Sequence, residues 1–321
     1  MENIKYNKYG KSKEYYLSNK IRIYKLVGND YEMGCAYGYF NKNIYNVNKI
    51  YNHINNILKE KFSDLEYLQL IHKINIWQDR IDQNNMLDFY KGCSYYYKCD
   101  YRKLIFVIIL CEIFGYFCTI ITSQNDKSHF HFRICDVNKF SINLCNKYKS
   151  YVDIVNHNNE FTSIAHSLTL SKHTIISDKF NYSVKSSYRT NYKINLNNPY
   201  PIILTIFETF KSSKNIDDFR VNLNELNLND STYVSCYDKN KMYLISLNKS
   251  VKDICEKKDF VEISDYSPVI KKAMNLEDMF KRYKTIPDRN RAFTVVFDIN
   301  TNKLYVNNYL EKDEFISITL P

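Results

Sequence analysis

Three residues near the middle of the chain have the types and spacing needed for nucleophilic catalysis. Cys118 follows a long apolar stretch, and Arg133 and Asp136 come 15 and 18 residues after it. An arginine beside a thiol lowers the pKa of that thiol and favours the nucleophilic thiolate. A carboxylate such as that of Asp136 accepts a hydrogen bond from an amine and orients it. The alternative is a buried core cysteine beside a surface ion pair.

The elements around these residues are predicted from their apolar patterns. Residues Asp100–Gly115 are apolar nearly all round, which is typical of a buried helix. A β-branched run over Cys118–Ser123, a polar turn over 124–128 and an alternating segment over His129–Ile134 predict a β-hairpin. Pairing of its two strands would bring Arg133 beside the cysteine that opens the first strand.

Helical patterns come first along the rest of the chain, and strand patterns follow. Residues 1–20 are polar and predicted to be poorly ordered, a strand is predicted over Ile21–Leu26, and residues 30–116 are predicted to be mainly helical. Further helices are predicted over Ile202–Ser212, Ile216–Leu226 and Pro268–Lys284, and strands over Phe161–Leu170, His173–Ile176, Thr232–Tyr237, Met242–Leu247, Phe260–Ile263, Ala292–Ile299 and Lys303–Tyr309. This order indicates an α+β fold in one folded unit, with sheets packed against helices.

The composition bounds the class of protein. Of its 321 residues, 45% are hydrophobic and 16% aromatic, so a packed core is expected and global disorder is excluded. The net charge of +10 comes from basic residues scattered among acidic ones, so we expect no nucleic-acid partner. The nine cysteines are irregularly spaced and predict reduced thiols in a cytoplasmic protein. No glycine follows Gly115, so the later turns must use Asn, Asp, Ser or Lys.

Metal, cofactor and membrane roles find little support in the sequence. His129 and His131 are spaced to share one face of a strand, which is half of a metal site, but no third ligand cluster follows. We therefore expect no metal and no cofactor, with both histidines at the surface or at a sheet edge. Cys135 is predicted to be a core residue. The apolar stretch Leu104–Cys118 is shorter than the roughly 20 residues that span a bilayer, so no integral membrane segment is expected.

The segment 105–136 resembles the nucleophile region of one group of N-terminal nucleophile (Ntn) hydrolases. This group comprises acid ceramidase, N-acylethanolamine acid amidase and the penicillin acyltransferase-like C45 peptidases. Its pattern is an apolar helix with an acidic residue, then Cys-Thr, a β-hairpin and Arg-x-x-Asp, which here correspond to Glu112, Cys118-Thr119, Arg133 and Asp136. The stretch Leu26–Gly38 also resembles the opening of the C45 proteins, through Gly28, Tyr31, Glu32, Gly34 and Gly38.

The resemblance implies an αββα sandwich, with residues 1–117 as a helical N-terminal part and residues 118–321 as the Ntn-hydrolase-like part. Members of the family are made as precursors that cleave themselves before the nucleophile, here between Phe117 and Cys118. The freed α-amine of the cysteine, with a pKa of about 8, then acts as general base for its own thiol. The implied activity is that of a hydrolase or acyltransferase for small N-acyl substrates with a linear amide bond, with Arg133 and Asp136 supporting the nucleophile.

Three departures from the family pattern leave other functions open. Phe132 stands where the family has a glycine, and residues 161–180 lack the glycines of the corresponding stretch. Asp265, in the sequence Ser-Asp-Tyr, stands where the family has its oxyanion asparagine, and a carboxylate donates no hydrogen bond unless it is protonated. The alternatives are a catalytically impaired relative that binds an acyl ligand or a partner protein, and a basic structural or interaction protein. The acyl group, the amine and the oligomeric state are left open.

Overall fold

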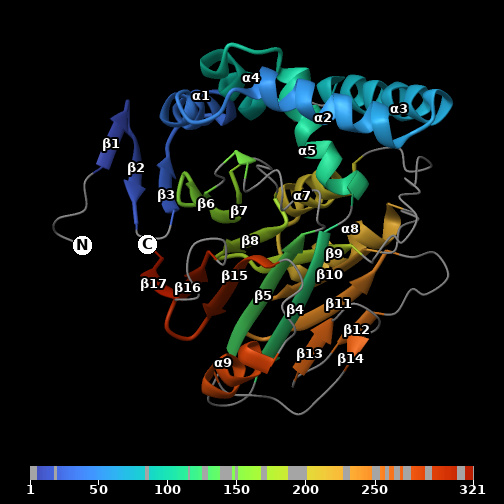
Figure 1. The fold of residues 1–321 in the computed structure, drawn as a ribbon. Coiled ribbons are helices and arrows are strands. Elements are labelled where there is room, and N and C mark those ends of the chain that lie inside the picture. Colours follow the sequence, from blue (N-terminus) through green and yellow to red (C-terminus); the bar gives the residue numbers. More distant parts are fainter. Residues whose placement is uncertain are drawn as a thin grey trace.

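Strands and helices fill separate layers of the molecule (Figure 1). The computed structural model describes residues 6–17, 20–83, 87–114, 116–124, 129–137, 147–148, 151–167, 172–186, 201–226, 232–247, 254–256, 260–263, 268–269, 276–285, 291–308 and 315–320. Within these residues the strands form two sheets, and helices cover them. The expected α+β fold is thereby confirmed.

The chain begins with a β-hairpin and a third strand. Strands β1 (Tyr6–Tyr9) and β2 (Ser12–Tyr16) pair antiparallel across a turn at Gly10, whose φ is +56°. Strand β2 also pairs with β3 (Ile21–Leu26). The prediction that residues 1–20 are poorly ordered is wrong for this hairpin, because side chains of β2 are buried at alternate positions.

Five helices follow and form a layer over one end of the sheets (Figure 1). They are α1 (Asp30–Asn41), α2 (Val47–Lys61), α3 (Asp64–Gln83), α4 (Asp88–Tyr97) and α5 (Tyr101–Phe114). A capping box starts α1, because Asn29 and Glu32 each accept a hydrogen bond from the other's backbone amide. The mainly helical character predicted for residues 30–116 is confirmed as far as Phe114, and Tyr116 already belongs to a strand. Helix α5 descends from this layer toward the strand that carries Cys118 (Figure 1).

Helices α1 and α4 lie in backbone contact, and glycines allow this approach. A Cβ atom added at Gly34 would lie 1.9 Å from the carbonyl oxygen of Phe89. A Cβ atom added at Gly92 would lie 2.2 Å from the carbonyl oxygen of Tyr31. The glycine spacing in the stretch Leu26–Gly38 therefore serves close helix packing.

The variant Gly34→Ala is expected to lower the free energy of unfolding by about 1–3 kcal/mol, because the added methyl group must push the two helices apart. Urea unfolding followed by circular dichroism measures the change. At an uncrowded helix position the same substitution gains about 1 kcal/mol of helix propensity. A stabilised variant would therefore contradict the close contact.

The strands form a larger and a smaller sheet. The larger has the order β1-β2-β3-β6-β7-β8-β9-β10-β11-β12, and the smaller has the order β14-β13-β4-β5-β15-β16-β17. The remaining strands are β4 (Tyr116–Gln124), β5 (His129–Val137), β6 (Val152–His157), β7 (Phe161–His166), β8 (Thr174–Ser177), β9 (Asn181–Ser186), β10 (Thr232–Tyr237), β11 (Met242–Ser246), β12 (Ile254–Glu256), β13 (Phe260–Ile263), β14 (Pro268–Val269), β15 (Arg291–Asp298), β16 (Lys303–Asn307) and β17 (Ile316–Thr319). Strands β3 and β6 pair in parallel, which joins the N-terminal strands to the rest of the larger sheet.

The two sheets pack face to face, and helices cover their outer faces. Apolar side chains such as Ile154, Leu244 and Val295 fill the space between the sheets. Helices α7 (Ile202–Ser212) and α8 (Ile216–Glu225) pack on the outer face of the larger sheet. Helix α9 (Leu276–Thr285) packs on the outer face of the smaller one. The helix predicted over Pro268–Lys284 is wrong at its start, because its first two residues form β14.

Asparagine supplies the unusual backbone conformations that glycine would otherwise supply. After residue 115, the described residues with positive φ are Asn158, Asn159 and Asn302, which lie in turns between strands. This agrees with the expectation for the glycine-free part of the chain. Among the described residues, no helix is both long enough and apolar enough to cross a membrane.

A buried ion cluster links β2, β3, β6 and α1. The Arg22 guanidinium donates to Asp153 Oδ1 from Nε at 3.0 Å and from Nη2 at 2.9 Å. Glu14 Oε1 lies 3.7 Å from Nη1 of the same arginine, and the Tyr37 hydroxyl donates to Asp153 Oδ2. Burial raises the pKa of Asp153 to about 6, although the arginine opposes this shift.

Candidate functional site

The register of the β4–β5 hairpin determines which predicted site residues can meet. Cys118 pairs with Cys135, and Ile120 pairs with Arg133. Residues paired across antiparallel strands lie on the same face of a sheet, and so do residues two apart along a strand. The register therefore assigns positions 118 and 133 to one face of the smaller sheet. Strand β4 begins at Tyr116, two residues before the cysteine that was expected to open it. The Cys118 side chain lies outside the described residues.

Arg133 is a buried cation between the two sheets. Arg133 is 1% exposed, and Ile120, its paired residue in β4, is fully buried. The guanidinium Nη1 donates a hydrogen bond to the Thr174 hydroxyl of β8, in the facing sheet. His173, the residue before Thr174, is also buried, and burial and then the charge of Arg133 lower the pKa of His173 well below its ordinary value. A positive charge is thus fixed in the layer between the sheets.

A chain of hydroxyl and imidazole groups extends from Arg133 along the same layer. His131 Nδ1 lies 2.9 Å from the Thr122 hydroxyl, and Nε2 lies 2.7 Å from the Ser183 hydroxyl. The Ser183 hydroxyl donates in turn to Thr174 Oγ1 at 3.2 Å. These contacts join the two sheets through polar groups.

The histidines of the hairpin are buried, so the expectation of surface or edge histidines is wrong. His129 and His131 point into the layer between the sheets, and His131 stacks on Tyr237 with ring centroids 4.6 Å apart. Burial lowers the pKa of His131 to about 3 and that of His129 to about 4. Both rings are therefore neutral at physiological pH. The described residues contain no group of three or more His, Cys, Asp or Glu side chains that could hold a metal ion.

The register assigns Asp136 to the opposite face of the smaller sheet from Arg133. Asp136 pairs with Phe117 in β4 and with Arg291 in β15, and it belongs to the other alternating set of β5. Its position is therefore beside the backbone of residue 117. The side chains of Asp136 and Glu112 lie outside the described residues, as does all of Asp265.

The departure from the family pattern at Phe132 does not affect the face of Arg133. Phe132 is fully buried and packs on the outer face of the smaller sheet, with Val296 of β15 and Met279 of α9. Cys135 is 3% exposed and lies in the apolar layer between the sheets, as predicted for a core residue.

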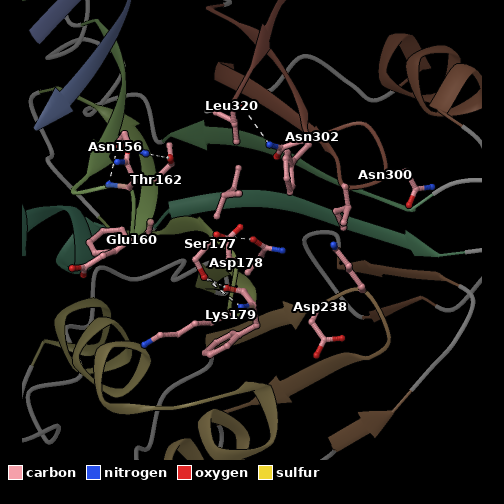
Figure 2. Close-up of a pocket in the computed structure, with 18 of the residues that line it drawn as sticks. Asn156, Glu160, Thr162, Ser177, Asp178, Lys179, Asp238, Asn300, Asn302 and Leu320 are labelled. Atoms are coloured by element: carbon pink, nitrogen blue, oxygen red, sulfur yellow. Dashed lines mark hydrogen bonds between the residues drawn. The ribbon is translucent and has the colours of Figure 1, made fainter.

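A pocket of about 620 Å³ lies at the other end of the sheets (Figure 2). Four turns line it, those between β6 and β7, β8 and β9, β10 and β11, and β15 and β16. Ile299 lines the pocket and donates its backbone amide to the carbonyl of His129, the first residue of β5. Cys118 pairs six residues further along β5, roughly 20 Å away at about 3.3 Å per residue. The pocket is therefore separate from the Cys118 position.

Several polar side chains in this pocket hold the turns themselves. Asp238 Oδ1 accepts hydrogen bonds from the amides of Asn240 and Lys241, both at 2.7 Å. Asn181 Oδ1 accepts one from the amide of Ser177 at 2.9 Å. These hydrogen bonds stabilise the turns, which explains why asparagine and aspartate are frequent in the lining of the pocket.

Sequence reasoning missed several buried basic residues. Lys185 of β9 is 2% exposed and belongs to the same alternating set as Ser183, which faces the layer between the sheets. Lys172 and His157 are buried as a pair on the other side of the larger sheet. No strand is predicted over Asn181–Ser186. The sequence pattern therefore gives no reason to place Lys185 on the inward face of a sheet.

The comparisons with known proteins add no relative. The sequence matches no model of a protein family, and no curated protein matches it.

Proposed function

We propose that this protein is a cysteine-dependent hydrolase or acyltransferase of the Ntn type, with Cys118 as its nucleophile and a linear N-acyl amide as its substrate. The observation that carries the proposal is the hairpin register, which assigns positions 118 and 133 to the same face of the smaller sheet. Two face-to-face sheets with helices outside both are the layer order expected of an αββα sandwich. Phe132 packs outward, so its presence is compatible with this site.

Maturation would begin with the thiol of Cys118 adding to the carbonyl carbon of Phe117. The peptide bond then breaks as the acyl group moves from nitrogen to sulfur, and water hydrolyses the thioester to a free carboxyl group on Phe117. Cys118 is left with a free α-amine and a free thiol. Since Asp136 pairs with Phe117, its position is next to the new amine, where a carboxylate can accept a hydrogen bond from it.

In turnover, the α-amine of Cys118 takes the proton of the thiol, and the thiolate attacks the amide carbonyl of the substrate. The amine part of the substrate leaves with that proton. The acyl group stays on the sulfur of Cys118 until water or another acceptor removes it. The buried charge of Arg133 favours the thiolate over the thiol. Asp265 would take part in stabilising the tetrahedral oxygen only in its protonated form.

The ionised form of Asp265 favours a second candidate function, that of an impaired relative that binds an acyl ligand without cleaving it. Loss of one oxyanion donor costs about 10²–10³ in rate. Self-cleavage of the chain separates the two candidates.

The purified wild-type chain is expected to separate under denaturing conditions into fragments of residues 1–117 and 118–321, and Cys118→Ala is expected to remain one chain. Intact-mass analysis measures both. The matched control is Cys135→Ala, which removes the paired thiol on the same face and is expected to leave cleavage unchanged. A wild-type chain that stays intact between pH 4 and pH 8, with a Cys118 thiol that does not react with alkylating reagents, contradicts the enzyme proposal.

A further inference from the structure

A buried amine on the far side of the larger sheet has no role in the proposed hydrolase site. Lys172 precedes β8 and is 7% exposed. Its Nζ lies 2.9 Å from Nε2 of His157, the last residue of β6, whose ring is also buried. Among the described residues, His157 is the only hydrogen-bond partner of this Nζ. A buried lysine ordinarily pairs with a carboxylate, so this arrangement is unusual.

Three phenylalanine rings from three different elements surround the amine. Nζ lies 5.0 Å from the ring centroid of Phe89 in α4, 5.7 Å from that of Phe161 in β7 and 5.5 Å from that of Phe207 in α7. All three residues are only half-buried, so this phenylalanine cage extends from the amine to the molecular surface. His157 stacks on Phe161 with ring centroids 4.4 Å apart, which fixes the imidazole against the cage.

The charges around the cage do not compensate a lysine cation. Asp30 of α1 is engaged by Lys211 of α7 at 3.2 Å, and this pair is largely exposed. Cys93 of α4 is buried, and burial raises the pKa of its thiol well above the ordinary value. Burial lowers the pKa of Lys172 to about 7, against smaller opposing effects of Asp30 and Cys93. His157 stays neutral, because burial and then Lys172 lower its pKa well below the ordinary value.

We propose that Lys172 is a second reactive site of this protein, an amine that forms an imine with a small apolar aldehyde or ketone held in the phenylalanine cage. His157 is a positioning residue, because its Nε2 lies within hydrogen-bond distance of both Nζ, at 2.9 Å, and the Ser163 hydroxyl, at 3.1 Å, and so holds the amine in place. The cage selects apolar substituents, and its π faces stabilise the cationic iminium that forms when the imine is protonated.

The reaction balances without an oxidant or a reductant. The nitrogen lone pair of the neutral amine forms a bond to the carbonyl carbon, and one amine proton passes to the carbonyl oxygen to give a carbinolamine. The second amine proton and the hydroxyl group leave as water, and a carbon–nitrogen double bond remains. Only the neutral form of the amine reacts, so the fraction of neutral lysine determines the rate. With a pKa of about 7, about half of Lys172 is neutral at pH 7, whereas roughly one in 2,500 lysines with the ordinary pKa of about 10.4 is neutral.

Reductive trapping tests the proposal on the full chain. The protein is treated with acetaldehyde and sodium cyanoborohydride at pH 7, and the rate at which each lysine gains an ethyl group is measured by peptide mass spectrometry. Lys172 is expected to react at least about 10-fold faster than the exposed Lys179, a margin that allows for restricted access to a neutral amine that is up to about 10³-fold more abundant. Between pH 6 and pH 9, the rate at Lys172 is expected to level off above pH 7, whereas the rate at a free lysine derivative with the ordinary pKa of about 10.4, added as a standard, continues to rise.

A variant of the cage distinguishes a reactive amine from one that is merely accessible. Phe207→Ala opens the cage to water, which restores the charged form of the amine, so the rate at Lys172 is expected to fall at pH 7. A Lys172 that reacts no faster than Lys179 at pH 7 overturns the proposal. So does a faster reaction in Phe207→Ala, because the rings would then act only as a barrier. None of these outcomes depends on whether the chain cleaves itself at Cys118.

Discussion

Replacement of Arg22 by methionine is expected to lower the free energy of unfolding by about 3–5 kcal/mol. Methionine can fill part of the space of the arginine side chain, but it supplies no charge and no hydrogen-bond donors. Asp153 and Glu14 would then be buried as carboxylates without their cation. An uncompensated buried charge costs far more than the pair contributes, so the loss exceeds that for an ordinary core substitution.

Urea unfolding of Arg22→Met measures this loss, and Arg102→Met is its matched control. Arg102 forms an ion pair of the same length with Asp79, 2.9 Å, but its side chain is 45% exposed. Exposed pairs contribute about 0–1 kcal/mol, so the control is expected to change stability by no more than that. The double variant Arg22→Met with Asp153→Asn is expected to recover part of the loss. A loss as small as that of Arg102→Met would mean that water reaches the carboxylates.

The loss in Arg22→Met is also expected to depend on pH. The pKa of Asp153 is about 6 in the fold against an ordinary value of 3.8, so its contribution to stability is present below the ordinary value and is lost as pH rises through 6. Without the arginine the pKa of Asp153 rises further. The variant is therefore expected to lose more stability at pH 8 than at pH 5, and an equal loss at both values would contradict the buried location of the charge.

Local patterns in the sequence predict the β4–β5 hairpin, although β5 is buried on both of its faces. The β-branched run Cys118–Ser123 and the alternating His129–Ile134 indicate its two strands, which in the structure span Tyr116–Gln124 and His129–Val137. Strand β6 was missed because polar residues such as Asp153 and Asn156 interrupt its apolar residues, although every residue of Val152–His157 is buried. The Arg22–Asp153 pair was missed for another reason, since 131 residues separate its partners and only the parallel pairing of β3 with β6 joins them.

Some contacts of the candidate site follow from local sequence, and others depend on residues that are distant in the sequence. The hairpin register relates Cys118 to Arg133, and sequence spacing was sufficient to expect that relation. Thr174 and Ser183 come from β8 and β9 of the other sheet, and packing between sheets leaves no mark on local periodicity. The same limit applies to Lys172, whose cage collects rings from α4, β7 and α7.

The variant Arg133→Met is expected to slow alkylation of Cys118 by iodoacetamide at pH 6 by about 10-fold to 1000-fold. A cation close to an acidic group lowers its pKa by about 1–3 units, and only the thiolate reacts with the reagent. Arg133 is buried on the face to which the register assigns Cys118, so water screens its charge weakly. Arg133→Lys is expected not to restore the wild-type rate, because a point charge on a flexible stem replaces a planar group held by Thr174.

Peptide mass spectrometry after labelling of the folded protein gives the rate at Cys118, and Cys236 in the same sample reports whether the variant is folded. Cys236 is fully buried, and burial raises the pKa of its thiol, so it is expected to stay unlabelled in a folded chain. Labelling of both cysteines would show that Arg133→Met has unfolded, in which case Arg133→Lys carries the comparison because it keeps the buried charge. An unchanged rate at Cys118 with a protected Cys236 would make Arg133 a packing residue, since its charge would then have no effect on the thiol that it was proposed to activate.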